Sequence, residues 1–285
     1  MKVAITGSHG LIGSALVRHL TADGDDVVRV SRDDSGHFDT SAIHGVDAVV
    51  HLGGVGIADK RWSNSHKQRV LDSRVEGTTA VARAVAEADP PPALLSASAL
   101  GYYGDRGSEE ITEESGPGTG FLADVCVAWE KATESAEQAG ARVVHLRTGL
   151  VLTPEGGALK KQLPLFKAGV AGKLGSGRQW FSWITLEDEI NAILFALREP
   201  RIEGAINLTA PHPVTNAEFT KALGHALHRP TVLSVPAAAL KVALGAEFAA
   251  EMVLAGAKVL PRALESAGFT FAHPTLEEAL AALLG

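Results

Sequence analysis

The chain has 285 residues, of which 46% are hydrophobic, and this length suits one domain with an added lobe or two domains. A net charge of −7 without any basic run argues against a nucleic-acid partner. No uninterrupted apolar stretch is long enough to span a bilayer, so we expect no membrane partner. Cys126 is the only cysteine, which excludes an intrachain disulfide and a cysteine metal cluster and fits a cytoplasmic protein.

The first thirteen residues predict a strand, a glycine turn and a helix. The apolar run 3–5 precedes glycines at three-residue spacing, and apolar residues at helical spacing follow over 15–20. Gly7 would permit a sharp turn, Gly10 would let the backbone approach a pyrophosphate, and Gly13 would let the helix pack on the strand. The N–H groups at the helix start would then face the phosphates. We therefore predict a dinucleotide site that comprises Gly7, Ser8, Gly10, Leu11, Ile12 and Gly13. The alternative is a glycine turn that binds nothing.

The second predicted strand, 26–32, ends where the adenosine ribose of a dinucleotide lies. NAD-type enzymes commonly place Asp or Glu there, whereas this chain has Ser31 and Arg32. A hydroxyl and a guanidinium suit a 2′-phosphate, so we predict that these two residues select NADP (NADPH). The alternative is an exposed Arg32 that pairs with Asp33 or Asp34.

The third predicted strand, 48–52, ends at two glycines that would let the adenine side of a cofactor lie against the backbone. His51 is expected to be packed or hydrogen-bonded rather than catalytic. A loop and a helix follow over 61–79, and Arg74 on that helix either reaches a phosphate or is a solvated charge. The predicted cofactor contacts of this region are His51, Leu52, Gly53, Gly54 and Arg74, and Ser96 of the next strand is a further one.

The next strand, 93–98, is followed by Gly101-Tyr-Tyr-Gly104. Hydroxyl groups at the carboxyl end of a central strand lie where doubly wound sheets bind ligands, so Ser98, Tyr102 and Tyr103 are the candidate catalytic residues. A helix over 121–139 and a strand over 142–152 complete a repeated β-α order. That order predicts an α/β fold with a doubly wound parallel sheet of Rossmann type.

The pattern changes after Pro154, where glycines divide the chain into short pieces. The aromatic cluster Trp180, Phe181 and Trp183 indicates either a junction between lobes or a wall of the substrate site. Later residues predict a helix over 187–197, a strand over 204–208 and a helix over 216–227 with Thr215 or Asn216 as its N-cap. We therefore predict a dinucleotide domain over residues 1–155 and 183–208. A smaller and mostly helical substrate lobe would comprise 156–182 and 209–285, with a helical tail over about 236–285. The substrate cleft would lie between the domain and the lobe.

The opening Thr6-Gly-x-x-Gly-x-x-Gly13 resembles that of extended short-chain dehydrogenases/reductases, and the resemblance covers nearly the whole chain. Segments 146–152, 175–188 and 206–208 resemble later parts of that family. The details that resemble one branch, the SulA-like members of the NAD-dependent epimerase/dehydratase family, are Gly101-Tyr-Tyr-Gly104, Arg61-Trp62, Ser73-Arg74, Gly-Arg-Gln-Trp180 and Leu260-Pro-x-x-Leu…Ala-Gly-Phe-Thr-Phe271. The resemblance implies a tail domain of unassigned function and a nucleotide sugar as the substrate.

Related extended enzymes use Ser or Thr with Tyr-x-x-x-Lys, in which Tyr is the acid or base, Lys lowers its pKa and Ser orients it. Ser98 matches the serine by this resemblance. The tyrosine and lysine positions, counted back from Glu130, carry Leu122 and Cys126. Lys131 would lie on a different helix face and cannot replace the lysine.

Three interpretations stay open. Tyr102 or Tyr103 serves as the acid beside Ser98 and the cofactor ribose, or the reaction needs little protein acid, or the chain binds NADP without turnover. A phenol with a pKa near ~10 could still donate a proton, which favours carbonyl reduction over alcohol oxidation. We expect an NADP-dependent oxidoreductase or epimerase-like enzyme for an unidentified small molecule. The alternative is a silent NADP(H)-binding sensor or scaffold, and a homodimer is left open.

Overall fold

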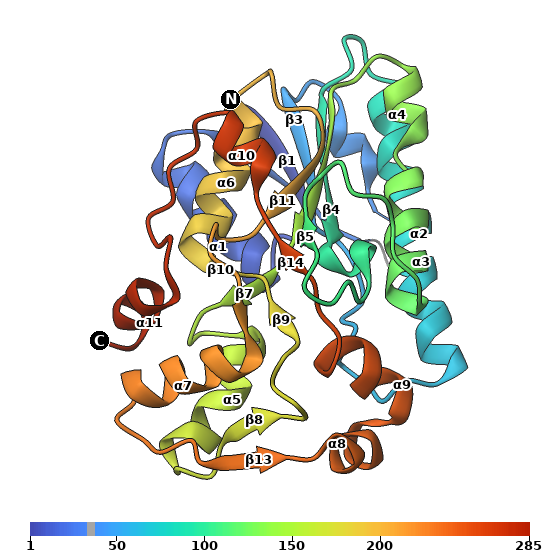
Figure 1. The fold of residues 1–285 in the computed structure, drawn as a ribbon. Helices are drawn as coiled ribbons and strands as arrows, with labels where there is room; N and C mark the ends of the chain where they lie inside the picture. The colour runs from blue at the N-terminus through green and yellow to red at the C-terminus, as the bar shows by residue number, and fades with distance from the viewer. Residues whose placement is uncertain (33–37) are drawn as a thin grey trace. The chain divides into compact units, whose positions relative to one another are not determined.

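The computed structural model describes residues 1–32 and 38–285. These residues form two compact units between which the chain passes several times, and Figure 1 shows the path. Across the described residues, no helix combines the length and apolar character that crossing a membrane requires. The first unit comprises Met1–Ala99, Asp124–Arg147 and Ile190–Ile206, and the second comprises Leu100–Ala123, Thr148–Glu189 and Asn207–Gly285.

The first unit is built on a six-stranded sheet with the order β11-β6-β4-β3-β1-β2. The pairs β1–β2, β1–β3 and β3–β4 are parallel, which confirms the predicted α/β fold on a parallel sheet. The order reverses at β1, so the ends of β1, β2 and β3 frame the crevice where such sheets bind ligands. The strands are β1 Lys2–Thr6, β2 Asp26–Val30, β3 Ala48–His51, β4 Ala93–Ala99, β6 Val143–Thr148 and β11 Gly204–Leu208.

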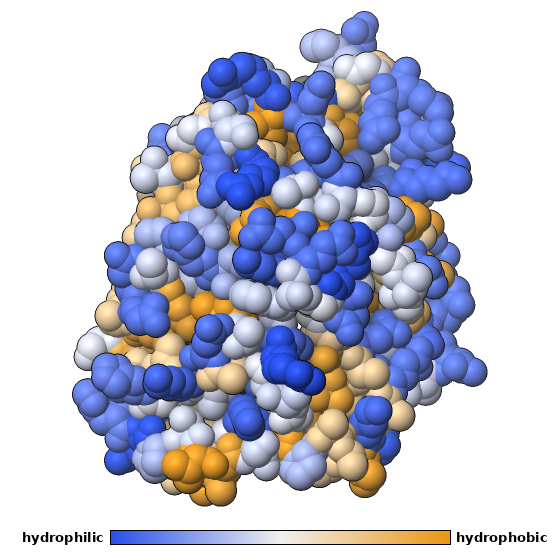
Figure 2. Space-filling view, in the orientation of Figure 1, coloured by the Kyte–Doolittle hydropathy of each residue, from blue (hydrophilic) through white to orange (hydrophobic). Residues whose placement is uncertain are grey.

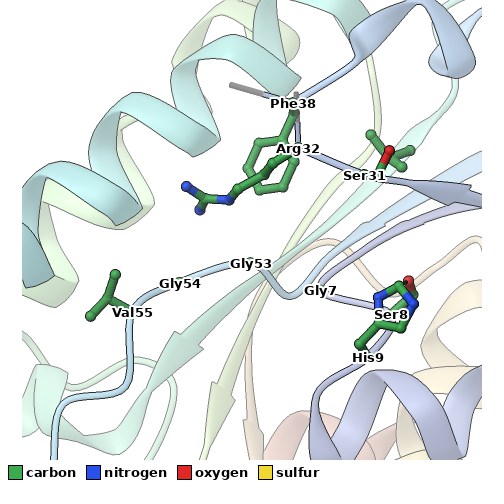
Figure 3. A pocket seen from close by; sticks show the side chains of 10 residues that line it. Gly7, Ser8, His9, Ser31, Arg32, Phe38, Gly53, Gly54 and Val55 are labelled. Carbon is green, nitrogen blue, oxygen red and sulfur yellow. Dashed lines mark hydrogen bonds between the residues drawn. The ribbon is translucent and has the colours of Figure 1, made fainter. Parts of the chain in front are cut away.

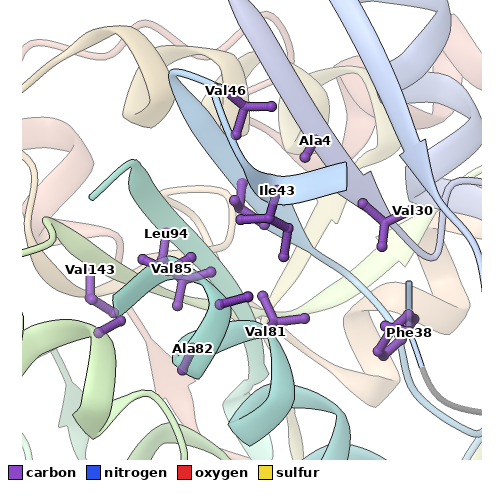
Figure 4. Packing of buried hydrophobic residues seen from close by; sticks show 13 residues of the cluster. Ala4, Val30, Phe38, Ile43, Val46, Val81, Ala82, Val85, Leu94 and Val143 are labelled. Carbon is purple, nitrogen blue, oxygen red and sulfur yellow. The ribbon is translucent and has the colours of Figure 1, made fainter. Parts of the chain in front are cut away.

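Helices of the first unit cover the sheet through apolar side chains. In Figure 4, Val81, Ala82 and Val85 of one long helix face Leu94 and neighbouring strand residues, and all are buried. That helix begins after Ser63, whose hydroxyl accepts the His66 N–H at 3.2 Å. The helical elements are α1 Leu11–Ala22, η1 Thr40–Ile43, α2 Asn64–Ala86, α3 Phe121–Lys131, α4 Glu134–Gln138 and α6 Leu186–Arg198, of which α3 and α6 begin in the second unit.

Two predicted elements are each divided in the structure. The helix expected over 121–139 breaks between α3 and α4, where the Thr133 hydroxyl donates to the Glu130 carbonyl oxygen at 2.7 Å. The strand expected over 142–152 breaks at Gly149, where the hydrogen-bond partner changes: the Gly149 N–H donates to the Leu208 carbonyl oxygen and the Leu150 N–H donates to the Ser182 carbonyl oxygen, each at 2.9 Å. Beyond Gly149 the chain leaves the central sheet and forms β7 (Leu150–Leu152), which pairs in parallel with β10 (Trp183–Thr185).

The second unit consists of short strand pairs and helices around its own core. Trp183 is fully buried and packs in one cluster with Leu152, Leu159 and Phe219, so this tryptophan of the aromatic cluster is a core residue. Thr215 is the N-cap of α7 and forms a capping box with Glu218. The remaining elements are η2 Leu100–Tyr103, β5 Glu110–Ile111, α5 Gly157–Lys167, β8 Gly172–Leu174, β9 Trp180–Phe181, β12 Val214–Thr215, α7 Asn216–Ala226, β13 Leu233–Val235, α8 Ala237–Leu244, α9 Ala246–Phe248, the π-helix Ala249–Val253, β14 Lys258–Val259, α10 Arg262–Ser266 and α11 Leu276–Leu284.

The second unit also exposes large apolar side chains near β13 and α8. Figure 2 shows apolar surface at the lower edge of the view, where Figure 1 places β8, β13 and α8. Val232 and Val242 are the most exposed, at 88% and 79%. In the same unit, the segment after Tyr103 contacts the C-terminal region, because β5 pairs in parallel with β14.

Glu189, at the start of α6, is a fully buried carboxyl in the second unit. Its Oε1 accepts the Thr148 hydroxyl at 2.8 Å, whereas its Oε2 has no hydrogen-bond partner among the described residues. Burial raises the pKa of Glu189 from 4.5 to about 8, because the charged form loses its hydration. The folded chain therefore holds a protonated carboxyl at neutral pH.

This raised pKa predicts a specific pH dependence of stability. Below about pH 4.5 the Glu189 carboxyl is protonated in both the folded and the unfolded state. Between about pH 4.5 and about pH 8 it is protonated only in the folded state, so the free energy of unfolding falls as pH rises. Glu189→Gln removes this titration, so the free energy of unfolding of the variant should rise relative to that of the wild type by on the order of a few kcal/mol between these two pH values. Urea denaturation at several pH values measures the difference. Glu187→Gln, at an exposed position of the same turn, is the control, and parallel pH profiles for Glu189→Gln and wild type would contradict the prediction.

Candidate functional site

The turn between β1 and α1 is shaped by two backbone contacts. Gly7 has a φ of 65°, and a Cβ there would lie 2.7 Å from the Leu52 carbonyl oxygen. A Cβ at Gly13 would overlap the Gly7 carbonyl oxygen, so α1 starts directly against the turn. Gly10 differs, because its Cβ would meet only the Gly7 oxygen at 3.3 Å. The backbone at Gly10 is therefore less crowded than at Gly7 or Gly13.

The start of α1 presents backbone donors beside this turn. Gly10 is the N-cap and provides no side-chain hydrogen bond, and the first turn contains no acidic residue. Leu11 and Ile12 of that turn are partly buried, and Ser8 just before it is buried. A helix start without a capping side chain is an arrangement suited to an anion.

A cavity of about 370 Å³ lies beside the turn, at the ends of β1, β2 and β3. Figure 3 shows Arg32 and the Gly53-Gly54 backbone facing each other across it. The predicted residues Gly7, Ser8, Ser31, Arg32, Gly53 and Gly54 all line this cavity. Sequence reasoning missed its other lining residues, which are His9, Val30, Phe38 and Val55.

Arg32 is supported by an aromatic ring. Its guanidinium carbon lies 4.5 Å from the centre of the Phe38 ring, and the two residues form an isolated antiparallel β-bridge. Gly53 makes room for the ring, since a Cβ there would press on Phe38. Asp33 and Asp34, the predicted alternative partners of Arg32, lie outside the described residues. The result is an exposed cation that borders the cavity on a flat apolar support.

His51 is a neutral, packed histidine. Its Nδ1 lies 2.8 Å from the Thr6 hydroxyl oxygen, which also accepts the Leu52 N–H at 3.1 Å. The ring is fully buried and meets Phe38 edge-on at 5.4 Å. Burial, with a smaller contribution from the Arg32 charge, lowers the pKa of His51 to about 3. The side chain therefore ties the end of β3 to that of β1 and has no surface for a ligand.

Two further predicted cofactor residues lie deeper in the first unit. Leu52 is partly buried at the end of β3, and Ser96 is buried within β4. The Ser96 hydroxyl has no hydrogen-bond partner in the part of the chain that the structure describes.

Ser98, at the end of β4, belongs to a buried ionic network. Its hydroxyl donates to Glu130 Oε1 at 2.6 Å, and Arg147 Nε and Nη2 donate to the two oxygens of Glu130, each at 2.8 Å. Burial alone would raise the pKa of Glu130, but the bonds and charge of Arg147, with the Ser98 hydroxyl, hold it below its ordinary value. An ionised carboxylate accepts only, so the Ser98 proton points to Glu130 and its oxygen lone pairs remain for another donor.

The positions of the absent tyrosine and lysine lie on α3. In the second unit, the Phe121 and Leu122 N–H groups donate to the two oxygens of Glu251 at 3.2 and 3.0 Å, so the C-terminal region caps the start of α3. In the first unit, Cys126 is buried. Burial, aided by the charge of Glu130, raises the pKa of its thiol to about 12. Cys126 is therefore neutral and cannot supply the positive charge of a lysine.

Tyr102 and Tyr103 differ in their surroundings within the second unit. Tyr103 is fully buried, and its hydroxyl donates to Asn207 Oδ1 at 2.7 Å. The Asn207 side-chain NH₂ in turn donates to the Leu260 carbonyl oxygen at 3.0 Å. Tyr102 keeps partial exposure and meets the Tyr103 ring edge-on at 5.2 Å. Among the described residues there is also no group of three or more His, Cys, Asp or Glu that could hold a metal.

Comparison with known proteins gives a consistent result. An epimerase family protein of Mycobacterium bovis (strain ATCC BAA-935 / AF2122/97) is 50% identical over 98% of this chain and 96% of its own length. The structure resembles the human epimerase family protein SDR39U1 (isoform2) with NADPH, with a TM-score of 0.91, 33% identity and coverage of 100% and 99% of the two chains. It also resembles a nucleoside-diphosphate sugar epimerase from Corynebacterium glutamicum, with a TM-score of 0.82 and 37% identity over 100% of this chain and 58% of that one.

Two family models account for most of the sequence. A domain of unknown function, DUF1731, matches residues 235–283, which correspond to the helical tail. The NAD dependent epimerase/dehydratase model matches residues 3–208, a span that contains the glycine turn, the cavity and the Ser98 network. This chain therefore belongs to the NAD dependent epimerase/dehydratase family.

Proposed function

We propose that this chain is an NADP(H)-dependent oxidoreductase or epimerase-like enzyme that acts on a small molecule. The observation that carries the proposal is the position of Arg32, exposed over the Phe38 ring at the edge of the cavity. A guanidinium there suits a 2′-phosphate, and the two residues that follow β2 are Ser31 and Arg32, neither of which carries a carboxylate for a ribose hydroxyl. The human relative with bound NADPH supports the same cofactor.

The remaining cavity residues fit the rest of an adenine dinucleotide. The backbone at Gly10 and the uncapped start of α1 would hold the diphosphate. Gly53 and Gly54 would let the adenosine lie against the backbone. A bound nicotinamide supplies the hydride that the family's chemistry transfers.

The chain must supply the proton transfer. Ser98 offers an acceptor oxygen, because its own proton is held by Glu130. Tyr102 is the candidate proton donor, since Tyr103 is buried and its hydroxyl is bound to Asn207. A nucleotide sugar is the substrate class we favour, on the strength of the Corynebacterium relative.

A second candidate function is NADP(H) binding without turnover, as a sensor or scaffold. It is favoured by Leu122 and by the neutral thiol of Cys126 at positions where related enzymes carry their acid and its cationic helper. The two functions are separated by a screen of carbonyl compounds, nucleotide sugars included, with NADPH consumption as the readout. Tight NADPH binding with no consumption across the screen would favour the sensor.

Cofactor selectivity tests the role of Arg32. We expect Arg32→Ala to weaken NADPH binding by on the order of 1.5–3 kcal/mol, because charge-assisted hydrogen bonds to the 2′-phosphate are lost. NADH binding should change little. Calorimetric titration of both cofactors measures the ratio, and Arg18→Ala, at an exposed position of α1, is the matched control. An unchanged NADPH/NADH ratio in Arg32→Ala would remove the main support for the proposal.

The two tyrosines should separate into a catalytic and a structural role. With a substrate from the screen, Tyr102→Phe should lower kcat by on the order of 100-fold or more, as expected for a lost general acid. Tyr103→Phe should keep turnover but lower the free energy of unfolding by about 1–3 kcal/mol, because buried Asn207 loses its donor. Steady-state kinetics and urea denaturation of both variants decide the point; normal turnover by Tyr102→Phe would exclude its role as the acid.

A further inference from the structure

In the second unit, a stretch of the C-terminal region lies against the segment that carries Tyr102. We call residues 102–122 the tyrosine segment and residues 251–263 the tail segment. Figure 1 shows β5 of the tyrosine segment beside β14 of the tail segment. The tail segment lies within the residues that match the domain of unknown function. It contacts the tyrosine segment near its start, in its middle and at its end.

Backbone and side-chain bonds join the two segments in their middle. The Arg106 N–H donates to the Gly256 carbonyl oxygen at 3.3 Å, just before β5 and β14 pair in parallel. Glu110 and Lys258 are opposite each other in that pair, and the ammonium donates to the carboxylate at 2.7 Å. The strand pairing therefore fixes which part of the tail segment lies beside which part of the tyrosine segment.

Each segment also supplies a carboxylate that binds backbone N–H groups of the other. Glu251 of the tail segment accepts the N–H groups of Phe121 and Leu122, at 3.2 and 3.0 Å. In the opposite direction, Glu113 Oε1 accepts the Ala263 N–H at 3.2 Å. Hydrogen bonds to an ionised acceptor are stronger than neutral ones. The end of the tyrosine segment is thus held at two places.

Tyr102 rests on a small core that both segments build. The buried members of this cluster are Tyr103, Ile111, Ala257 and Val259, and Tyr102 is partly buried against them. Two of the four buried residues come from the tail segment. The position of the Tyr102 ring therefore depends on the tail segment as well as on its own.

The tail segment is fixed in turn by residues that precede α6. The Ser182 hydroxyl donates to the Ala257 carbonyl oxygen at 2.8 Å and accepts the Val259 N–H at 3.0 Å. The Gln179 side-chain NH₂ donates to the Val253 carbonyl oxygen at 3.0 Å. Because Ser182 is buried, loss of its hydroxyl would leave backbone groups of the tail segment unpaired.

We propose that the tail segment positions Tyr102 for proton transfer, with Glu251 as a positioning residue at the far end of the tyrosine segment. The inference rests on the proposed function, in which Tyr102 is the proton donor. A proton donor must stay within hydrogen-bond reach of its acceptor. Tyr102 lies on the four-residue helix η2, and so short a helix provides little rigidity of its own. The tail segment supplies the rigidity that a long helix would otherwise give.

Hydrogen exchange measured by mass spectrometry tests whether the tail segment holds the tyrosine segment. In Glu251→Gln the neutral side chain has one acceptor oxygen for two N–H groups, so exchange in the tyrosine segment should rise by on the order of 10-fold. Exchange in β1, β3 and β4 and the affinity for NADPH should stay at the wild-type values, because the cofactor cavity belongs to the first unit.

Two further variants frame this measurement. Ser182→Ala removes the other attachment, so it should accelerate exchange in the same segment, and it covers the case in which Glu251→Gln does not fold. Glu265→Gln is the matched control, because it removes an exposed carboxylate of α10 that pairs only with Arg262 among the ion pairs of the described residues. Its exchange should equal that of the wild type.

Turnover tests whether the tail segment acts through Tyr102. With a substrate from the screen, Glu251→Gln should lower kcat by on the order of 10-fold and leave the KM for NADPH unchanged. In a Tyr102→Phe background the same substitution should cause no further loss of kcat, because the group that it positions is already absent. A purely structural role would lower kcat equally in both backgrounds.

Three results would overturn the inference. Wild-type exchange in both Glu251→Gln and Ser182→Ala would show that the tail segment does not hold the tyrosine segment. Faster exchange throughout the chain would show a general loss of stability. Faster exchange with an unchanged kcat, or equal losses of kcat in the two backgrounds, would show that Tyr102 is not the group that is positioned. If the wild type consumes no NADPH across the screen, the proposed function fails and the role of Tyr102 with it, whereas the exchange data still decide whether the two segments are joined.

Discussion

The first unit depends on the close approach of α1 to the turn that precedes it. The contact between Gly13 and the Gly7 carbonyl oxygen leaves no room for a side chain, and the same turn presses on the end of β3 at Leu52. These contacts place the N-terminus of a helix beside the ends of three parallel strands. The cavity lies beside this turn and is lined by Gly7 and Ser8. A methyl group at either Gly7 or Gly13 would have to move backbone, which is costly in a packed core.

Features that depend on neighbours in sequence could be predicted from the sequence. The glycine spacing, the strands at 2–6 and 204–208, and the Thr215 cap follow from local patterns. Features that depend on distant contacts could not. At Gly149 the backbone changes its partner from Leu208 to Ser182, and Phe38 lines the cavity while it forms a β-bridge with Arg32. Apolar content gave no signal for either.

Two arginines of the first unit, Arg147 and Arg74, differ in their contacts. Arg147 donates two parallel bonds to Glu130, and such a pair costs little net energy when every polar atom is satisfied. From the sequence, Glu130 serves only as the reference from which positions 122 and 126 are counted. Its pairing cannot be predicted, because nothing local reveals a partner seventeen residues away on another element. Arg74 contacts the Trp129 ring and two backbone carbonyl oxygens instead. The pairing of Arg147 with Glu130 holds the carboxylate to which the Ser98 hydroxyl donates.

Cys126 lies in a buried environment, where desolvation is the largest influence on its thiol. A lysine at this position would place an ammonium out of water, which raises the cost of folding. A neutral thiol avoids that cost. In the second unit, the N–H groups of Phe121 and Leu122 bind the Glu251 carboxylate, so the start of α3 serves as an attachment point for the C-terminal region. The two positions that resemble the tyrosine and lysine of related enzymes thus carry an apolar side chain and a neutral thiol, and the backbone at the first of them is bound by a carboxylate from the C-terminal region.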